Sequence, residues 1–445
     1  MGSTYRICPL SFYFAFAGRT FMEDKIKEFS KAAIVGVITG GVGETEVNIS
    51  LDELTRLLDT AGGEVAIRMT QQLKSPNPAT LIGEGKAAEL AFLCHENEVE
   101  LAVFDSELSP SQIRNLENIL KDVRVIDRTM LILDIFALHA GSGEGKLQVE
   151  LAQLKYTAPR LIGKGAEMSR LGGGIGTRGP GESQLETDRR HIQRRVKALE
   201  DELAELEKTR RTMRVARDRS GIPKVAIVGY TNAGKSTLLN RLTDAGILAE
   251  DKLFATLDPT TRKFTLPGGE TVLLTDTVGF IRNLPHQLVK AFRSTLDEAV
   301  YADILIIICD ASDPEHLSQL EVTENTLNEL GAVDKPTLYV FNKCDIGAAG
   351  EIPFGVERPD NICYISAKTG QGIEHFVDRL EKIVLSGKTN EVFVIPNSEA
   401  GVLNTLYRNA TVTDVQYGDE SIRVCATVDA KVRGMLRDYL SEAKE

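Results

Sequence analysis

The stretch Gly229-Tyr230-Thr231-Asn232-Ala233-Gly234-Lys235-Ser236 decides the fold of this chain. It follows the apolar segment 225–228 and continues into Ser236-Thr237-Leu238-Leu239, which predicts a buried strand, a loop and a helix in that order. The two glycines let backbone N–H groups surround a phosphate at the positive end of the helix. Lys235 is expected to reach the outer phosphates and Ser236 to bind Mg²⁺. Because glycine-lysine-serine strings also occur in surface turns, the motif needs support from others.

A second motif, Asp276-Thr277-Val278-Gly279, ends the apolar segment 271–275. The carboxyl end of a parallel strand places the Asp276 carboxylate where it can hold the Mg²⁺ shell through water. The Gly279 N–H is then expected to meet a γ-phosphate. The two motifs together predict a nucleoside triphosphate site.

Two later segments predict which base is bound. Asn342-Lys343-Cys344-Asp345 follows the apolar segment 337–341, so the Asp345 carboxylate can accept from N1–H and the exocyclic amine of guanine while Asn342 contacts the other edge. Adenine lacks that donor pair, and leaving two such groups unmatched costs about 2–6 kcal/mol. Ser366-Ala367-Lys368 is expected to complete the pocket with backbone N–H groups. These segments predict GTP and GDP as ligands.

The segment Leu253-Phe254-Ala255-Thr256-Leu257-Asp258-Pro259 lies between the phosphate loop and Asp276, where a switch loop is expected. Thr256 is the threonine that we expect to join Mg²⁺ when γ-phosphate is present. Thr260 and Thr261 are alternatives, and a plain turn around Asp258-Pro259 is the other interpretation.

Phe280 follows Gly279 at the position where many regulatory GTPases carry a glutamine that orients the attacking water. A phenyl ring cannot orient water, so we expect the isolated chain to hydrolyse GTP slowly. A partner that orders the switches or supplies a catalytic group would accelerate it, by about 10³–10⁵ for an inserted arginine. The alternative is that a nearby polar residue or the bound water network orients the attacking water in place of the glutamine.

The predicted site has three sets of residues. Catalysis is assigned to Lys235, Thr256 and Gly279, and Mg²⁺ binding to Ser236 and Thr256. The nucleotide-binding set comprises Gly229, Tyr230, Thr231, Asn232, Ala233, Gly234, Lys235, Ser236, Phe254, Ala255, Thr256, Leu257, Asp258, Asp276, Thr277, Val278, Gly279, Asn342, Lys343, Cys344, Asp345, Ser366, Ala367 and Lys368.

Composition predicts a cytoplasmic protein of several domains. A chain of 445 residues exceeds the size at which a single core keeps growing. The net charge of −12 argues against a generally basic nucleic-acid binder, although a whole-chain sum conceals local patches. Six cysteines without a C-x-x-C pair predict reduced thiols rather than disulfides or a zinc site. No apolar run approaches the roughly 20 residues that span a bilayer, and nothing supports peripheral membrane association.

Residues 1–22 are interpreted as an extension of uncertain origin, with a weak signal peptide as the alternative. Residues 23–140 alternate apolar segments with helical patterns, which predicts a small parallel α/β domain. Gly83-Glu84-Gly85-Lys86 is expected to cap a helix rather than bind phosphate. Strands are expected at 32–37, 65–69, 101–104 and 123–126, and helices near 52–58, 86–94, 110–120 and 131–138.

Residues 141–222 have the pattern of a helical hairpin. Its glycine-rich connection, 161–182, is either a slack linker or a device that binds RNA. Basic clusters near both ends of the second helix favour RNA phosphates, and a solvated face with internal Glu–Lys pairs is the alternative. The apolar positions expected to pair the two helices are Leu147, Leu151 and Leu154 on the first and Ile192, Val196, Leu199, Leu203 and Leu206 on the second.

The remaining sequence predicts a doubly wound GTPase domain at 223–388 and a small α+β module at 389–445. The module is expected to dock a partner or to act as a structural cap, with strand, helix, strand, strand and helix at 392–395, 400–407, 411–417, 421–427 and 431–440. The predicted fold class is therefore α/β: a P-loop GTPase domain preceded by an α/β domain with a helical hairpin and followed by a small α+β module.

Several stretches resemble the HflX family of ribosome-associated GTPases. They are Gly173-Gly174-Ile175-Gly176, Arg178-Gly179-Pro180-Gly181-Glu182, Gln184-Leu185-Glu186-Thr187-Asp188-Arg189-Arg190, Asn77-Pro78-Ala79-Thr80, Leu108-Ser109-Pro110-Ser111-Gln112 and residues 144–154, together with the switch and Asp276 motifs. The resemblance runs from about residue 35 to the carboxyl end.

This resemblance implies a GTPase that docks on the large (50S) ribosomal subunit, is stimulated by it, and acts in splitting or rescuing ribosomes or in subunit maturation. The family carries an aliphatic residue after the glycine of the Asp276 motif, and Phe280 matches that position here. The resemblance also implies Ser236 and Thr256 as Mg²⁺ ligands. The glycine loop would enter ribosomal RNA, with Arg170 and Arg178 as candidates for phosphate contact. We expect a monomer. The main alternative is a GTP-controlled scaffold or membrane-associated switch that recruits another protein through the hairpin. An RNA remodelling enzyme powered through the amino-terminal domain is a third class, and no second phosphate loop supports it.

Overall fold

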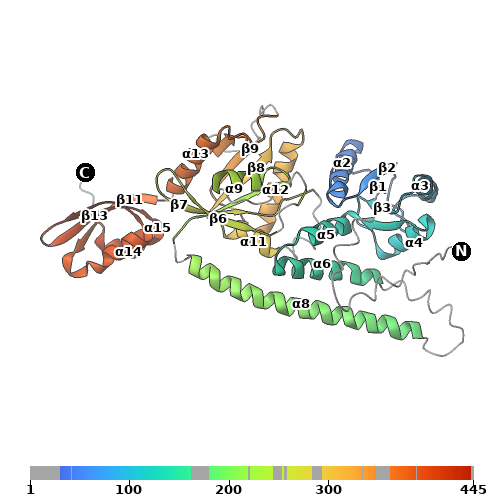
Figure 1. Cartoon of the computed structure of the whole chain (residues 1–445), viewed down its shortest axis with the longest axis horizontal. Coiled ribbons are helices and arrows are strands. Elements are labelled where there is room, and N and C mark those ends of the chain that lie inside the picture. Colours follow the sequence, from blue (N-terminus) through green and yellow to red (C-terminus); the bar gives the residue numbers. More distant parts are fainter. Residues whose placement is uncertain are drawn as a thin grey trace, which may run out of the picture. The chain divides into compact units, whose positions relative to one another are not determined.

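The structure is a computed structural model of the chain (Figure 1). The chain falls into two compact units, which are described separately. The amino-terminal unit comprises Met1–Leu203, Lys252–Phe254 and Leu284–Ala291, and the carboxyl-terminal unit comprises Ala204–Asp251, Ala255–Asn283 and Phe292–Glu445. The structure describes residues 31–41, 43–161, 180–218, 221–243, 253–254, 258–282, 293–332, 334–346, 361–386 and 388–441.

A four-stranded sheet in the order β2-β1-β3-β4 forms the core of the amino-terminal unit (Figure 1). Its pairings are all parallel, which confirms the predicted parallel α/β domain. The first helix is longer than predicted, because its apolar positions continue over Glu44–Thr60. The strands are β1 (Lys31–Ile38), β2 (Glu64–Gln72), β3 (Leu101–Phe104) and β4 (Arg124–Asp127), and the helices are α2 (Glu44–Thr60), α3 (Glu84–Glu96), α4 (Pro110–Leu120) and α5 (Arg128–His139). Gly83 is the N-cap of α3, as expected.

A buried ion network fills the carboxyl edge of this sheet. Arg128, which is 2% exposed, lies 2.7 Å from Asp105 and also pairs with Glu53 of α2. The Ser50 hydroxyl donates to the same Asp105 carboxylate at 2.7 Å. Ligands of open α/β sheets bind at this edge, and here it is occupied by paired side chains.

Helix α6 (Gly143–Leu161) is fixed to the end of this sheet by a second buried carboxylate. Asp127, which caps α5, accepts hydrogen bonds from the Tyr156 hydroxyl and from Arg160 at 3.1 Å. The buried positions Val149, Ala152 and Tyr156 therefore belong to a face of α6 that packs on α5. Of the predicted stripe, Leu154 is buried, whereas Leu147 and Leu151 are only half-buried.

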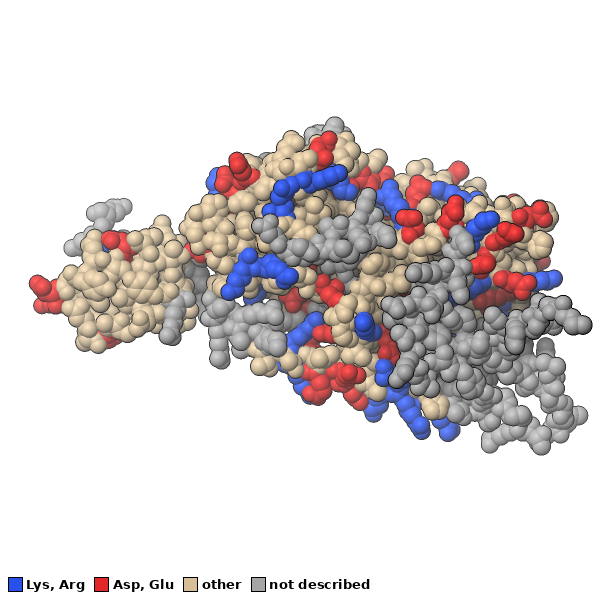
Figure 2. All heavy atoms as spheres, in the orientation of Figure 1, with Lys and Arg blue, Asp and Glu red and all other residues tan. Residues whose placement is uncertain are grey.

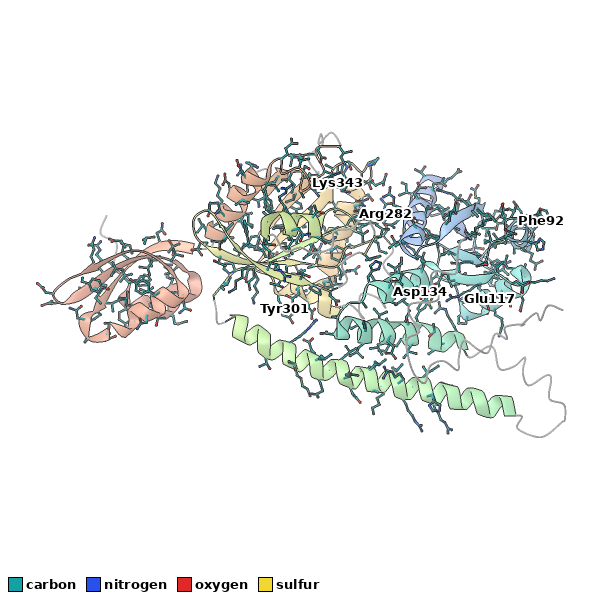
Figure 3. The ribbon with its side chains drawn as sticks, viewed as in Figure 1. Phe92, Glu117, Asp134, Arg282, Tyr301 and Lys343 are labelled. Carbon is teal, nitrogen blue, oxygen red and sulfur yellow. The ribbon has the colours of Figure 1, made fainter. Side chains whose placement is uncertain are left out.

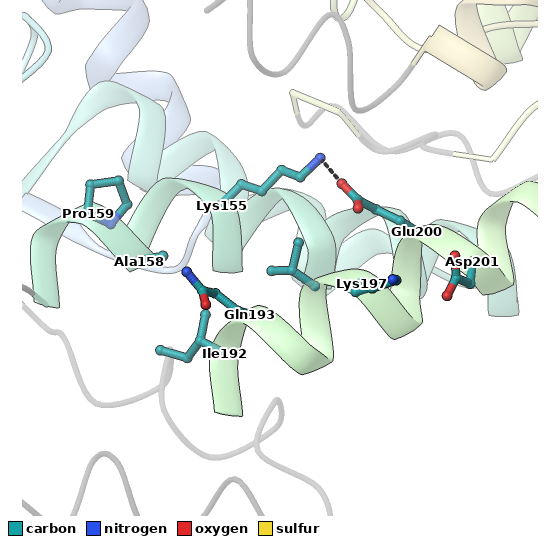
Figure 4. Close-up of a pocket in the computed structure, with 9 residues that line it drawn as sticks. Lys155, Ala158, Pro159, Ile192, Gln193, Lys197, Glu200 and Asp201 are labelled. Carbon is teal, nitrogen blue, oxygen red and sulfur yellow. Dashed lines mark ion pairs between the residues drawn. The ribbon is translucent and has the colours of Figure 1, made fainter. Parts of the chain in front are cut away.

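Helix α8 (Pro180–Asp218) is the second helix of the predicted hairpin. Lys155 of α6 lies 2.7 Å from Glu200 of α8, as Figure 4 shows, and Arg195 lies 2.7 Å from Glu150. Leu199 is fully buried, as its place in the predicted apolar pattern required. The helix begins at Pro180, inside the segment expected to be the connection, and the rest of that glycine-rich segment falls outside the described ranges.

The GTPase sheet has six strands in the order β10-β9-β8-β5-β7-β6 (Figure 1). Only the edge strand β6 runs antiparallel within it, and the strand that precedes the phosphate loop, β5, lies between β7 and β8. The predicted doubly wound fold is confirmed. The strands are β5 (Lys224–Gly229), β6 (Thr260–Thr265), β7 (Thr271–Asp276), β8 (Ile304–Asp310), β9 (Thr337–Asn342) and β10 (Ile362–Tyr364); the helices are α9 (Lys235–Thr243), α11 (Arg293–Tyr301), α12 (His316–Leu330) and α13 (Ile373–Ser386).

The terminal module is an antiparallel sheet in the order β11-β13-β12, as expected of an α+β unit. Its last helix was predicted over 431–440, and this is wrong beyond Met435. The chain leaves the helix because Leu440 bridges to Phe393 and the Ser441 N–H donates to the Val392 carbonyl at 2.8 Å. The elements are β11 (Lys388–Pro396), α14 (Gly401–Asn409), β12 (Thr411–Tyr417), β13 (Ser421–Asp429) and α15 (Ala430–Met435), with 3-10 turns at Asn397–Glu399 and Arg437–Tyr439.

Among the described residues, no helix combines the length and the apolar composition that crossing a bilayer requires.

Candidate functional site

The phosphate loop connects β5 to α9, as the sequence predicted. Gly234 has φ +99°, and a Cβ there would lie 2.1 Å from the Asn342 side-chain nitrogen, so only glycine fits. Lys235 is 6% exposed, and its Nζ donates to the Gly229 carbonyl at 3.1 Å and to the Tyr230 carbonyl at 2.7 Å. Burial lowers the pKa of Lys235 to about 8, and the nearby Asp276 carboxylate acts in the opposite direction. The loop therefore holds its ammonium group with little access to water.

The two side chains expected around Mg²⁺ lie together. The Ser236 hydroxyl donates to the Asp276 carboxylate at 2.6 Å, and Asp276 is fully buried at the carboxyl end of β7. A hydroxyl and a carboxylate are hard oxygen donors of the kind that Mg²⁺ prefers, so these residues fit the ion. Thr256 lies outside the described residues. Thr260 and Thr261, the alternatives for its role, belong to strand β6 and pair with β7.

The beginning of the switch segment has an unexpected environment. Phe254 is 2% exposed, has φ +57°, and packs edge-to-face against Phe136 of α5 with ring centroids 4.6 Å apart. The Leu253 N–H donates to the Thr60 hydroxyl of α2 at 3.2 Å. A bulky residue in the left-handed region is strained, and here burial of the ring offsets that strain. Residues 255–257 are not among those described.

The segment after β7 is hydrogen-bonded to the phosphate loop. The Phe280 N–H donates to the Gly229 carbonyl at 3.1 Å, and the Thr231 N–H donates to the Phe280 carbonyl at 2.8 Å. The Tyr230 hydroxyl accepts from the Arg282 N–H at 2.7 Å. The Phe280 ring is 1% exposed and is a core residue. Sequence reasoning placed Tyr230 in the loop but missed its contact with Arg282, because no local signal marks a contact of this range.

Gly279 lies directly against the phosphate loop. A Cβ at this position would be 2.7 Å from the Thr231 Cα and 2.9 Å from the Lys235 Nζ, so a side chain would force the backbone away. The two residues before it are buried: the Thr277 hydroxyl donates to the Ile227 carbonyl at 2.8 Å, and Val278 is 4% exposed. These two can offer a nucleotide only their backbone.

Asn342 connects two parts of the site. It is 3% exposed at the end of β9, and its Nδ2 donates to the Ala233 carbonyl of the phosphate loop at 2.8 Å. Its Oδ1 accepts from the Ala367 N–H at 2.9 Å. The sequence suggested contact with the guanine edge, whereas the structure places this amide between the phosphate loop and segment 366–368.

The other residues of the Asn342 motif are more accessible. Lys343, which is labelled in Figure 3, has φ +64°. Its ammonium lies 2.7 Å from Asp310 at the end of β8. The Cys344 N–H donates to the Ile365 carbonyl at 3.1 Å. Asp345 is exposed. A carboxylate presented to solvent on this fixed turn is available to a base.

Segment 366–368 is held from two sides. Ser366 is fully buried, and its hydroxyl accepts from the Thr369 N–H at 3.1 Å. Arg241 of α9 donates to the Ala367 carbonyl at 3.1 Å and to the Lys368 carbonyl. Sequence reasoning missed Arg241, because a single arginine on a helix carries no signal of a partner far along the chain.

Charge is distributed without a single dominant sign. On the face drawn in Figure 2, Lys and Arg side chains of the described residues are interspersed with Asp and Glu side chains. The net charge of −12 therefore coexists with local basic groups, as on α8.

Comparison with known proteins agrees with this geometry. Three family models match: "GTP-binding GTPase N-terminal" at residues 48–137, "GTP-binding GTPase Middle Region" at 139–217 and "50S ribosome-binding GTPase" at 224–343. A GTPase HflX from Lacrimispora saccharolytica is 48% identical over 414 residues, which cover 93% of this chain and 97% of the relative. The chain belongs to the HflX family of GTPases.

Other relatives extend the comparison. GTPase HflX from Escherichia coli is 44% identical over 361 residues, covering 80% of this chain and 84% of the relative. A solved GTP-binding protein from Sulfolobus solfataricus in complex with GDP is 28% identical, with 80% of this chain and 99% of that chain covered and a TM-score of 0.44. As a member of the HflX family, the chain binds GTP and GDP and hydrolyses GTP, and P-loop GTPases generally use Mg²⁺ for this reaction.

Proposed function

We propose that this GTPase docks on the large (50S) ribosomal subunit, is stimulated by it, and acts in ribosome splitting or rescue or in subunit maturation. The observation that carries this proposal is the match of residues 224–343 to a family described as 50S ribosome-binding GTPases. GTPase HflX relatives that align over most of the chain support it. The proposed partner is a cytoplasmic particle, so we place the protein in the cytoplasm. We also propose that it is a monomer.

The hairpin is the proposed RNA-binding part. Arg189, Arg194 and Lys197 are exposed near the beginning of α8, where they are available to phosphates. Arg195 is excluded from this set, because Glu150 accepts two hydrogen bonds from its guanidinium at 2.7 Å. The glycine-rich segment with Arg170 and Arg178 remains the proposed point of entry into ribosomal RNA.

The site residues have proposed roles in GTP hydrolysis. Lys235 and the Gly279 N–H bind the γ-phosphate, and Asp345 selects guanine. Ser236 and Thr256 hold Mg²⁺, with Asp276 acting through water. The ion, when bound, neutralises charge on the phosphates. Within this arrangement the protein excludes water from Lys235 and orients the phosphates for in-line attack.

Dependence on a partner follows from Phe280. Its ring is 1% exposed in the core, so it offers no polar group to the attacking water. The proposed role of the large subunit is to order the switch segments or to add a catalytic group. The proposed organisation is an extension at 1–22, an α/β domain at 23–140, the hairpin at 141–222, the GTPase domain at 223–388 and the module at 389–445.

The test is GTP turnover with and without purified large ribosomal subunits, repeated with residues 171–182 deleted. Strong stimulation that disappears on deletion supports ribosome-triggered hydrolysis through the glycine-rich segment. The Lys235→Ala variant is the control for turnover by contaminating enzymes. Equal rates in all conditions would favour the GTP-controlled scaffold or membrane-associated switch.

Salt dependence provides a second measurement. Binding through arginine–phosphate contacts weakens steeply as the salt concentration rises. Such binding releases counterions from the RNA, and their release is less favourable when the surrounding salt concentration is high. Cosedimentation with large subunits at increasing KCl should show this slope, and replacing Arg189 and Arg194 with glutamine should reduce it. Binding that is insensitive to salt would contradict the RNA-phosphate interface.

A further inference from the structure

Thr231 has a buried hydroxyl that the site described above does not use. It is the third residue of the phosphate loop and is 7% exposed. Its Oγ1 has no hydrogen-bond partner among the residues that the structure describes. Burying a hydroxyl without a partner costs free energy, and such groups in folded proteins call for a functional explanation.

The position of Thr231 places it beside the groups assigned to the γ-phosphate. A Cβ built on Gly279 would lie 2.7 Å from both Cα and Cγ2 of Thr231, and 2.9 Å from the Lys235 Nζ. The Thr231 N–H donates to the Phe280 carbonyl at 2.8 Å, which fixes the backbone of Thr231 against the segment that follows β7. The Thr231 side chain therefore lies against the Gly279 backbone through its Cγ2 methyl, and the Lys235 ammonium borders the same point of Gly279.

Among the described residues, the position that follows Gly279 offers no polar side chain to the attacking water. Phe280 follows Gly279, and its ring is buried in the core. A threonine hydroxyl has one donor and two acceptor sites, so it can contact a phosphoryl oxygen and a water at the same time. Orienting the attacking water is the function that a glutamine serves in other GTPases.

We propose that Thr231 is a catalytic residue of GTP hydrolysis. Its hydroxyl accepts a hydrogen bond from the attacking water and donates one to a γ-phosphoryl oxygen. The water oxygen forms a bond to the γ-phosphorus while the bond to the β–γ bridging oxygen breaks, and GDP leaves with that electron pair. The two protons of the water pass to inorganic phosphate and to solvent. Thr231 itself is unchanged.

The proposal is tested with Thr231→Val, which keeps the branched shape and removes the hydroxyl, and Thr231→Ser, which keeps the hydroxyl. Single-turnover hydrolysis at saturating GTP and Mg²⁺ is measured on the full chain without ribosomal subunits, so the result does not depend on the proposed ribosomal partner. We expect Thr231→Val to lower the rate constant by about 10²–10³-fold, the range for removing one hydrogen-bond donor that stabilises the transition state. Thr231→Ser should stay within about threefold of the wild-type chain.

Nucleotide affinity separates a catalytic role from a structural one. Affinities for GDP and for a non-hydrolysable GTP analogue should change by less than about threefold in both variants, because the backbone of the loop is retained. A wild-type hydrolysis rate in Thr231→Val would overturn the proposal, and so would a loss of rate that the loss of GDP affinity fully explains. Thr231→Ala is the substitute if the valine variant does not bind GDP, and the same criteria apply to it.

Discussion

Replacing Asn342 with alanine removes the side chain that joins the phosphate loop to the proposed base-binding segment. The amide is 3% exposed, donating to the Ala233 carbonyl at 2.8 Å and accepting from the Ala367 N–H at 2.9 Å. Alanine leaves both backbone groups buried without their partner. The variant should therefore weaken the GTPase domain and its nucleotide affinity together.

The magnitude follows from the two lost contacts. A buried backbone group left without a partner costs about 1–3 kcal/mol, so two of them cost about 2–6 kcal/mol. Total stabilities are about 5–15 kcal/mol, so this is a large fraction. Since about 1.4 kcal/mol corresponds to a factor of ten, the folded-to-unfolded ratio of the GTPase domain should fall by at least about 30-fold.

The assay is urea unfolding of the full chain, followed by circular dichroism, because the sequence contains no tryptophan. A chain of several domains unfolds in more than one step, and the GTPase transition is identified as the one that GDP shifts. Competition against a fluorescent GDP analogue gives the affinity. Asp345→Ala is the matched control: this carboxylate is exposed on the same motif, so the urea midpoint should stay unchanged while preference for GDP over ADP falls.

One result would refute the reasoning about Asn342. If Asn342→Ala retained the wild-type urea midpoint of the GDP-sensitive transition and bound GDP normally, the two hydrogen bonds would contribute nothing to the site. Loss of specificity without loss of stability would instead return Asn342 to the direct base contact that the sequence suggested.

Three further predictions concern the phosphate loop and its neighbours. Burial lowers the pKa of Lys235 to about 8, and bound phosphates favour its charged form, so GDP binding should take up a proton above about pH 8 and the affinity should fall as the pH rises from about 8 to 9. Calorimetry in buffers of different ionisation enthalpy measures this uptake, and a flat profile would contradict it. Gly279→Ala should lower affinity for a GTP analogue at least about tenfold and leave GDP affinity within about threefold, because a Cβ would lie 2.7 Å from the Thr231 Cα and displace the N–H assigned to γ-phosphate. Equal losses for both nucleotides would argue for general disruption. Tyr230→Phe removes the acceptor of the Arg282 N–H, a contact worth about 0.5–1.5 kcal/mol, so hydrogen exchange at Arg282 should become about 2–10-fold faster. Unchanged exchange would show that the hydroxyl does not hold the segment that follows β7.

The sequence predicted the fold class and the ligand because their signals are contiguous. The order apolar strand, glycine loop and helix in residues 225–239 largely defines the phosphate cradle, since the backbone N–H groups come from neighbouring residues. The same local patterns predicted the strands and helices of the amino-terminal α/β region and, in the GTPase region, the apolar strands beside the motifs and the helix after the phosphate loop. The prediction was wrong at the last helix, where a pairing of Leu440 with Phe393 ends the helical pattern early.

Only the tertiary structure decided how the motifs cooperate. The Asn342 amide reaches partners 109 and 25 residues away, and Arg241 holds carbonyls of segment 366–368, 126 and 127 residues further along the chain. Only the folded structure shows that the Thr231 hydroxyl is buried beside Gly279 without a hydrogen-bond partner among the described residues. Local patterns define which backbone a segment adopts, because backbone preference acts over a few residues. Which buried side chain completes a hydrogen bond depends on strands brought together by folding, and that information is spread over the whole chain.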